Sequence, residues 1–322
     1  PLLPLVGEDS KRFAAACLDG NGGVIGGSLW EAIPEERIRA LAAEIGNRLP
    51  RECRLVDPYG VGILESGDFE RRRAVALNYT NMIGHRQQDA LSIELYARRA
   101  YIVQEPGYPT PFSFRWQWDA HSMAHNTVTV DETQPPMFSY NRPTGGYGIT
   151  VLCVRAPGTG EANEPPAAGC NGRARLFACA GGVHALSASH DTYSGVVLGS
   201  RDARPVSIFE RMLVMVDADE DRFYAIDLFS VDGGEQHDLS WHAFDAPVTP
   251  PDLAWVAQEG GTLAGPDVER FSAYTDRWQR NYPHGHAPSF MTGVRRARLA
   301  GPACWKWDDG KPGGDRLRLH IV

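Results

Sequence analysis

The sequence predicts a mainly β fold, a large antiparallel β-sandwich preceded by a short helical segment. From Val61 onward, apolar residues recur at every second position in many short runs, which is the period of a half-buried strand. Gly, Pro, Asn and Asp cluster between these runs. Short strands separated by such turns are typical of antiparallel sandwiches. Before residue 55 the apolar period is helical instead.

The first 60 residues are expected to form a helical segment and a connector. One face of the predicted helix carries Ile38, Leu41, Ala42 and Ile45. Pro34 suits the first position of this helix, and Gly46 suits its end. The predicted domains are therefore a helical part at 1–60 and a sandwich at 61–322.

The predicted strands follow one another to the end of the chain. They cover 74–79, 90–96, 126–130, 149–155, 183–190, 208–216, 223–231 and 317–322. Residues 157–172 are rich in Gly, Pro and Ala and predict a surface loop. The chain begins at Pro1 and stops within the last strand-like run, so we expect it to be a piece of a longer protein.

Charge and composition narrow the possible partners. The 322 residues carry a formal net charge of −8, which argues against nucleic acid. An anionic sugar polymer is still compatible, because a local arginine cluster can act within an acidic protein. No window approaches 18 consecutive apolar residues, so no membrane span is expected. The six cysteines show no zinc-finger spacing, which leaves free thiols and disulfides both open.

Three polar residues in the stretch 84–131 are the strongest functional candidates. His85 stands at the entry to a predicted strand, and Glu105 follows the next strand in a Glu-Pro-Gly turn. His125 leads directly into a third strand. If these strands are neighbours, the three side chains meet at one end of the sheet, where a rigid scaffold usually presents functional groups.

This stretch resembles the heparinase II/III-like polysaccharide lyases. The family's His-x-His-x-Asp element is similar to residues 85–89, and its Asp-Pro-Gly-Tyr turn to 105–108. Its Ala-His-Asn-Thr-Val element is similar to 124–128, and a later element to 227–234, in the same order. The resemblance implies the sandwich half of a lyase for uronic-acid polysaccharides. It also implies a missing N-terminal helical toroid and a periplasmic or secreted location.

The resemblance assigns roles to individual residues. His85 matches the family's catalytic histidine, and the family's zinc ligands fall on Gln87, Glu105 and His125. An amide oxygen is a poorer zinc ligand than an imidazole. A metal-free version, in which Gln87 hydrogen-bonds Glu105 or His125, therefore stays open.

Arg72, Tyr108 and Trp116 are candidate substrate-binding residues. A guanidinium can pair with a uronate carboxylate, and aromatic rings can stack on sugars. A solvated surface position for the arginine and core packing for the aromatic residues remain the alternatives.

The implied chemistry explains the need for histidine. β-Elimination removes the C5 proton of a uronic acid, so the site must neutralise the carboxylate, accept that proton and protonate the leaving O4. An imidazole, with an ordinary pKa of about 6.5, can serve in either protonation state. Two other functions remain open. One is a noncatalytic carbohydrate-binding sandwich, and the other is a glycoside hydrolase, for which Asp89 and Glu105 are the only carboxylate pair near the motifs.

Overall fold

The computed structural model describes residues 40, 52–57, 59–67, 71–80, 87–98, 100–107, 118–132, 172–193, 206–272, 287–311, 314 and 316–322. The compact unit that carries the described strands comprises Cys53–Ser66 and Glu70–Val322. Apart from residue 40, the helix expected at 34–46 lies outside the described residues, as does the strand expected at 149–155.

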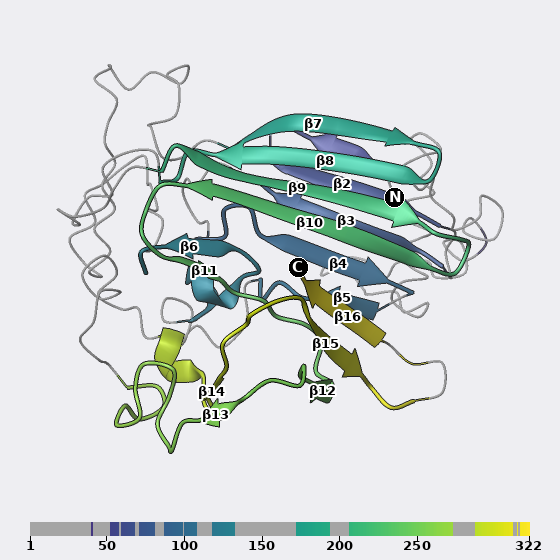
Figure 1. The fold of residues 1–322 in the computed structure, drawn as a ribbon. Coiled ribbons are helices and arrows are strands. Elements are labelled where there is room, and N and C mark those ends of the chain that lie inside the picture. The colour runs from purple at the N-terminus through teal and green to yellow at the C-terminus, as the bar shows by residue number, and fades with distance from the viewer. Residues whose placement is uncertain are drawn as a thin grey trace, which may run out of the picture. The chain divides into compact units, whose positions relative to one another are not determined.

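Two antiparallel sheets dominate the described structure (Figure 1). The first has the order β1-β2-β3-β4-β5, with bounds Arg54–Val56, Val61–Ser66, Arg73–Asn78, Ile93–Ala97 and Ala100–Val103. The second has the order β10-β9-β8-β7, with β7 at Gly172–Ala180, β8 at Val183–His190, β9 at Ile208–Asp217 and β10 at Phe223–Asp232. All of these strand pairs are antiparallel, so the predicted mainly β sandwich is confirmed.

Shorter elements complete the described chain. Strand β6 (Val128–Val130) pairs with β11 (His237–Leu239), and β13 (Val256–Ala257) pairs with β14 (Arg295–Arg296). A three-stranded sheet has the order β12 (Val248–Thr249), β15 (Ala303–Asp308) and β16 (Arg316–Ile321). Two 3-10 turns, η4 at Ser122–Ala124 and η5 at Ala287–Phe290, lie among them.

The core lies between the two main sheets. In the first sheet, Val75 and Leu77 alternate with half-buried residues along β3, so one face of the strand is buried. In the second sheet, Leu213 and Met215 do the same along β9. Both sets belong to one hydrophobic cluster, in which the two sheets pack face to face.

Gly62 of β2 allows a close approach between the sheets. A Cβ atom at this position would lie 2.6 Å from Cδ2 of Leu186, a fully buried residue of β8. Any larger residue would therefore push the layers apart or force Leu186 from its place.

The predicted and observed bounds of the strands agree best for β8, β9 and β10 of the second sheet. The predicted strand at 183–190 coincides with β8, and those at 208–216 and 223–231 end one residue before β9 and β10 do. The strand predicted at 90–96 starts late, at Ile93, because Leu91 adopts a φ of 58° and the chain turns there. The sequence analysis does not predict strand β7, because alternation is limited to 173–176 and the residues from 176 to 180 form a continuous apolar run; most of the strand is exposed.

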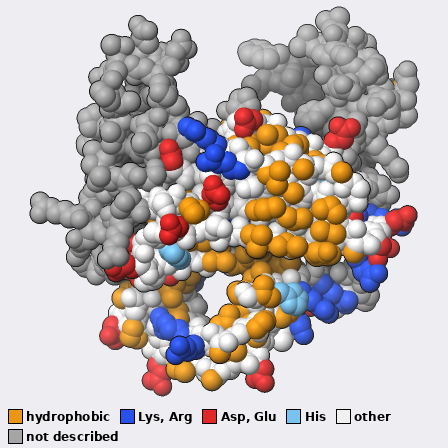
Figure 2. Space-filling model, turned by 45° about the horizontal axis from the view of Figure 1, so that its top comes forward, with side chains coloured by type: hydrophobic (Ala, Val, Ile, Leu, Met, Phe, Trp, Pro, Cys, Tyr) orange, Lys and Arg blue, Asp and Glu red, His pale blue; other side chains and the backbone are white. Residues whose placement is uncertain are grey.

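The outer face of the second sheet is apolar and exposed (Figure 2). Tyr224, Ile226 and Leu228 of β10 are 53%, 43% and 52% exposed. In β8, Val183 is also exposed and pairs with Val216 of β9. An exposed apolar sheet face of this kind is uncommon on protein surfaces.

A fully buried arginine links the second sheet to two loops. Arg211 of β9 donates from Nε to Asp227 of β10 at 2.8 Å, and from Nη2 to the same carboxylate. Its Nη1 donates to the backbone carbonyls of Leu91, at 2.7 Å, and Asn126. One guanidinium therefore satisfies one carboxylate and two buried carbonyls.

We expect Arg211→Met to lower the free energy of unfolding by about 3–5 kcal/mol, because it leaves Asp227 and two carbonyls without their partner. Urea denaturation measures this loss. Arg222→Ala is the matched control, since its exposed side chain pairs with Asp219 on the surface, and it should leave the midpoint nearly unchanged. An Arg211→Met midpoint equal to that of the control would contradict the assignment.

Candidate active site

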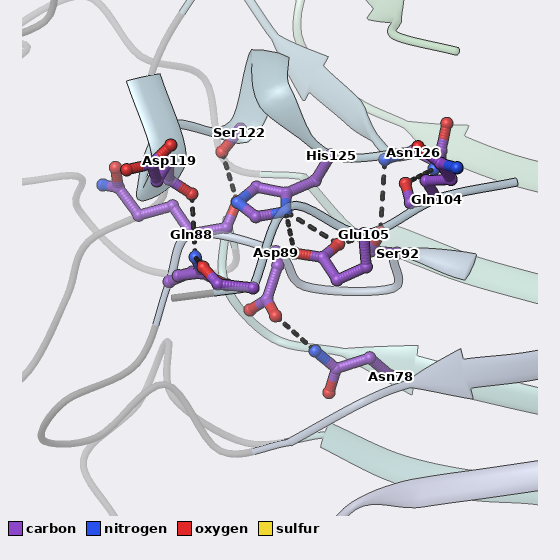
Figure 3. A network of polar contacts seen from close by, with 12 residues as sticks. Asn78, Gln88, Asp89, Ser92, Gln104, Glu105, Asp119, Ser122, His125 and Asn126 are labelled. Atoms are coloured by element: carbon purple, nitrogen blue, oxygen red, sulfur yellow. Dashed lines mark hydrogen bonds and ion pairs between the residues drawn. The ribbon is translucent and has the colours of Figure 1, made fainter. Parts of the chain in front are cut away.

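Two of the predicted site residues, a fully buried histidine and a partly buried glutamate, form a pair (Figure 3). Glu105 follows β5, and His125 follows the η4 turn and precedes β6. Nδ1 of His125 lies 2.7 Å from Oε1 and 2.9 Å from Oε2 of Glu105. The expectation that these two motifs meet in space agrees with the geometry. His85, Tyr108 and Trp116 lie outside the described residues.

The carboxylate determines the protonation of this histidine. Burial alone would lower the pKa of His125, because the ring is fully enclosed. The charge and hydrogen bond of Glu105, together with the charge of Asp89 and the backbone carbonyl of Asp119, outweigh burial and raise the pKa above its ordinary value. The pair therefore favours an imidazolium held against a carboxylate.

Asn126 holds the loops around this pair. Its Nδ2 donates to the carbonyls of Gln104 at 3.0 Å and Ile93 at 3.3 Å. Its Oδ1 accepts from the backbone N–H of His242 at 2.6 Å, and its own N–H donates to Ser92 Oγ at 3.2 Å. The side chain is fully buried. Sequence reasoning gave this residue no role, although it stands in the Ala-His-Asn-Thr-Val motif.

His242 is the second histidine of this region. Its Nε2 lies 2.7 Å from the carbonyl of Met123, and its ring meets Trp118 edge-on at 6.0 Å between centroids. Burial, with a smaller contribution from His125, lowers the pKa of His242. The site therefore holds one histidine that favours the charged form and one that favours the neutral form.

The described donors do not fit the zinc site implied by the resemblance. The amide nitrogen of Gln87 donates to the carbonyls of Gly107 and, at 2.9 Å, Asp119. Glu105 and His125 hold one another through the histidine Nδ1. Among the described residues, no third His, Cys, Asp or Glu completes a ligand group with them. The hydrogen bonds expected for a metal-free version are not formed either, because Gln87 bonds backbone carbonyls rather than Glu105 or His125.

The sequence match decides the family. The model described as "Heparinase II/III-like, C-terminal" matches residues 73–279, which contain the Glu105–His125 pair. The chain belongs to this heparinase II/III-like family.

Solved structures of named lyases are similar to this heparinase II/III-like chain. The heparan sulfate lyase HepC from Pedobacter heparinus is 12% identical, with a TM-score of 0.44 over 80% of this chain and 34% of that one. A heparinase III, the BT4657 gene product with methylated lysines, is 12% identical, with a TM-score of 0.41 over 70% and 29%. The chain thus spans about a third of their length. No curated protein matches it.

Arg72 of the heparinase II/III-like chain already pairs with a carboxylate. Its Nε lies 2.6 Å from Oε1 of Glu65, whose side chain is fully buried. The Arg72 guanidinium also lies over the ring of Tyr96, 5.4 Å from its centroid. The neighbouring Arg73 is buried and bonds Asp217 at 2.6 Å. The basic run therefore binds acidic groups of the protein itself.

Glu105→Gln should reverse the shift of His125. With the carboxylate gone, burial is the largest remaining influence, so we expect the pKa of His125 to fall below its ordinary value of about 6.5. Histidine NMR titration measures this value. His242 is the internal control, because its pKa should stay low. A His125 pKa that remains high in the variant would contradict the role of Glu105.

The same pair predicts a pH dependence of stability. The folded-state pKa of His125 exceeds the unfolded value, so its contribution is fully present below about pH 6.5. The contribution is lost as the pH rises through the folded-state pKa. Denaturation at several pH values should show this loss in the wild type and not in Glu105→Gln.

Proposed function

We propose that this chain is the sandwich half of a polysaccharide lyase that cleaves a uronic-acid polymer by β-elimination. The observation that carries the proposal is the Glu105–His125 pair, formed by two motifs of the matched family within its matched range. Gln87 donates to the carbonyls of Gly107 and Asp119, which lie close in sequence to this pair. His85 precedes Gln87 by two residues, in the same motif.

In the proposed reaction His85 is the catalytic residue. Its imidazole either neutralises the C6 carboxylate of the sugar or accepts the C5 proton. Glu105 and His125 are positioning residues, because His125 is fully buried and its Nδ1 is occupied by Glu105. Their contribution is a fixed, charge-paired support for the loops of the site.

The substrate is proposed to be an anionic polysaccharide. Tyr108 and Trp116 would stack on sugar rings. Arg72 uses its Nε for Glu65. Its four other N–H groups remain suited to a substrate carboxylate. The matched family is described as heparinase II/III-like. Because heparin is a glycosaminoglycan, polymers of this class are the first to test.

A periplasmic or secreted location is proposed from the family, because polymeric sugars of this kind lie outside the cytoplasm. Within the described part of the chain, no helix is long and apolar enough to cross a bilayer.

The geometry gives little support to a glycoside hydrolase. That reaction needs one carboxylic acid and one carboxylate placed across the sugar. Asp89 accepts a hydrogen bond from the side chain of Asn78, and Glu105 is paired with His125. Both candidate carboxylates therefore have structural partners.

We expect His85→Ala in the full-length protein to lower the elimination rate by roughly 10²–10⁴-fold, the range for a positioned acid–base group. The measurement is the ultraviolet absorbance of the unsaturated product on a panel of polyuronides. The isolated 322-residue chain should show little or no activity, since the toroid implied by the family would supply the opposite wall.

His320→Ala is the matched control, because His320 is an exposed histidine in β16 and outside the motifs. Its rate and melting temperature should equal those of the wild type. Near wild-type product formation by a folded His85→Ala protein would overturn the proposed role. Binding of the polymer without any cleavage by the full-length protein would favour the noncatalytic carbohydrate-binding alternative.

A further inference from the structure

Two cysteines and a histidine converge outside the candidate active site. Cys53 stands just before β1 in the first sheet, while Cys179 of β7 and His184 of β8 are directly paired in the second. Their ligand atoms all lie within 4.8 Å of one another. It is the only group of three potential metal ligands of this kind among the described residues.

The spacing suits a tetrahedral ion. The sulfur of Cys53 lies 3.3 Å from Nδ1 of His184. Zinc bonds of about 2.3 Å to sulfur and about 2.0 Å to nitrogen would set such donors roughly 3.5–3.8 Å apart. Small side-chain movements therefore suffice to form the site, and the exposed Cys179 leaves it open to solvent.

The carboxylate of Asp217 lies next to the other ring nitrogen of His184. Oδ2 of Asp217 lies 3.5 Å from Nε2 of His184, on the side of the ring away from the Cys53 sulfur. Ser66 and Arg73 donate to the other oxygen of Asp217, at 2.8 Å and 2.6 Å, and fix this carboxylate. Nε2 of His184 makes no hydrogen bond to any described residue, and a histidine that binds a metal commonly donates its second ring N–H to such a carboxylate.

This arrangement favours a metal over a disulfide. A bond between Cys53 and Cys179 would leave the imidazole aimed at the sulfurs without a function. Cys304 and His320 offer a comparison inside the same protein, because they also pair across two strands, with Sγ 3.6 Å from Nε2. That pair has one sulfur only and belongs to no described ligand group.

We propose that Cys53, Cys179 and His184 bind one zinc-class divalent ion, with a fourth position left for water. The ion would tie the start of β1 in one sheet to the β7–β8 hairpin in the other. The two thiols lose their protons to the solvent when they bind as thiolates, so affinity should fall as the pH falls. The site is separate from the zinc site that the family implies at Gln87, Glu105 and His125.

The test is a titration of the reduced full chain with Co²⁺, followed by displacement with Zn²⁺. We expect one Co²⁺ per chain, with the charge-transfer absorption of thiolate ligands, and a rise in melting temperature when Zn²⁺ binds. Cys53→Ser and Cys179→Ser should each remove most of this absorption. Asp217→Asn should keep the absorption but weaken binding by about 10–100-fold, as expected for a carboxylate behind a ligand.

Cys304→Ser is the matched control and should bind Co²⁺ as the wild type does. Melting curves without metal show whether each variant is folded, and His184→Gln serves where a cysteine variant is not. Absence of the thiolate band in reduced protein would overturn the proposal. So would an unchanged band in Cys53→Ser, or a Cys53–Cys179 disulfide, detected by alkylation, that forms in the presence of Zn²⁺.

Discussion

The region of the candidate active site depends on the hydrogen bonds of the buried Arg211 guanidinium. It joins β9 and β10, through Asp227, to the carbonyls of Leu91 and Asn126. Leu91 is a buried, non-glycine residue with a φ of 58°, a conformation that is costly for a large side chain. Two hydrogen bonds hold this turn in place. Arg211 donates to the carbonyl of Leu91, and the N–H of Leu91 donates to the carbonyl of Asn78.

The strained turn decides how the motif residues are presented. Because the chain turns at Leu91, Ser92 contacts Asn126, the neighbour of His125. Thr127 reinforces the same connection through its hydroxyl, which donates to the carbonyl of Ala90 at 2.6 Å. Hydrogen bonds from side chains thus connect these described loops, which are not joined by strand pairing. They restrict the conformations of the loops that carry the Glu105–His125 pair.

The sequence was sufficient for features that depend on local pattern. Strands β8, β9 and β10 could be predicted because one face of each strand packs against a core. The meeting of Glu105 and His125 could be expected because both stand in recognisable motifs, while their roles stay a prediction. The turn at Leu91 could not be predicted, because its alternation with Ser92 favours a strand. One of the two hydrogen bonds that hold the turn comes from Arg211, 120 residues away. The group of Cys53, Cys179 and His184 could not be predicted either, because its members are far apart in the sequence: Cys53 and His184 are separated by 131 residues.

Strand β9 shows how the two polar centres coexist. Its core-facing row starts with Phe209 and then carries Arg211 and, at the other end, Asp217, with Leu213 and Met215 between these two. Six residues of strand separate the charges by about 20 Å. Arg211 fixes the loops of the candidate active site, whereas Asp217 joins Arg73 and the His184 of the cysteine group. The apolar middle of the strand separates these two polar ends, so a metal bound at the cysteines would act on the contact between the sheets and not on the loops that Arg211 holds.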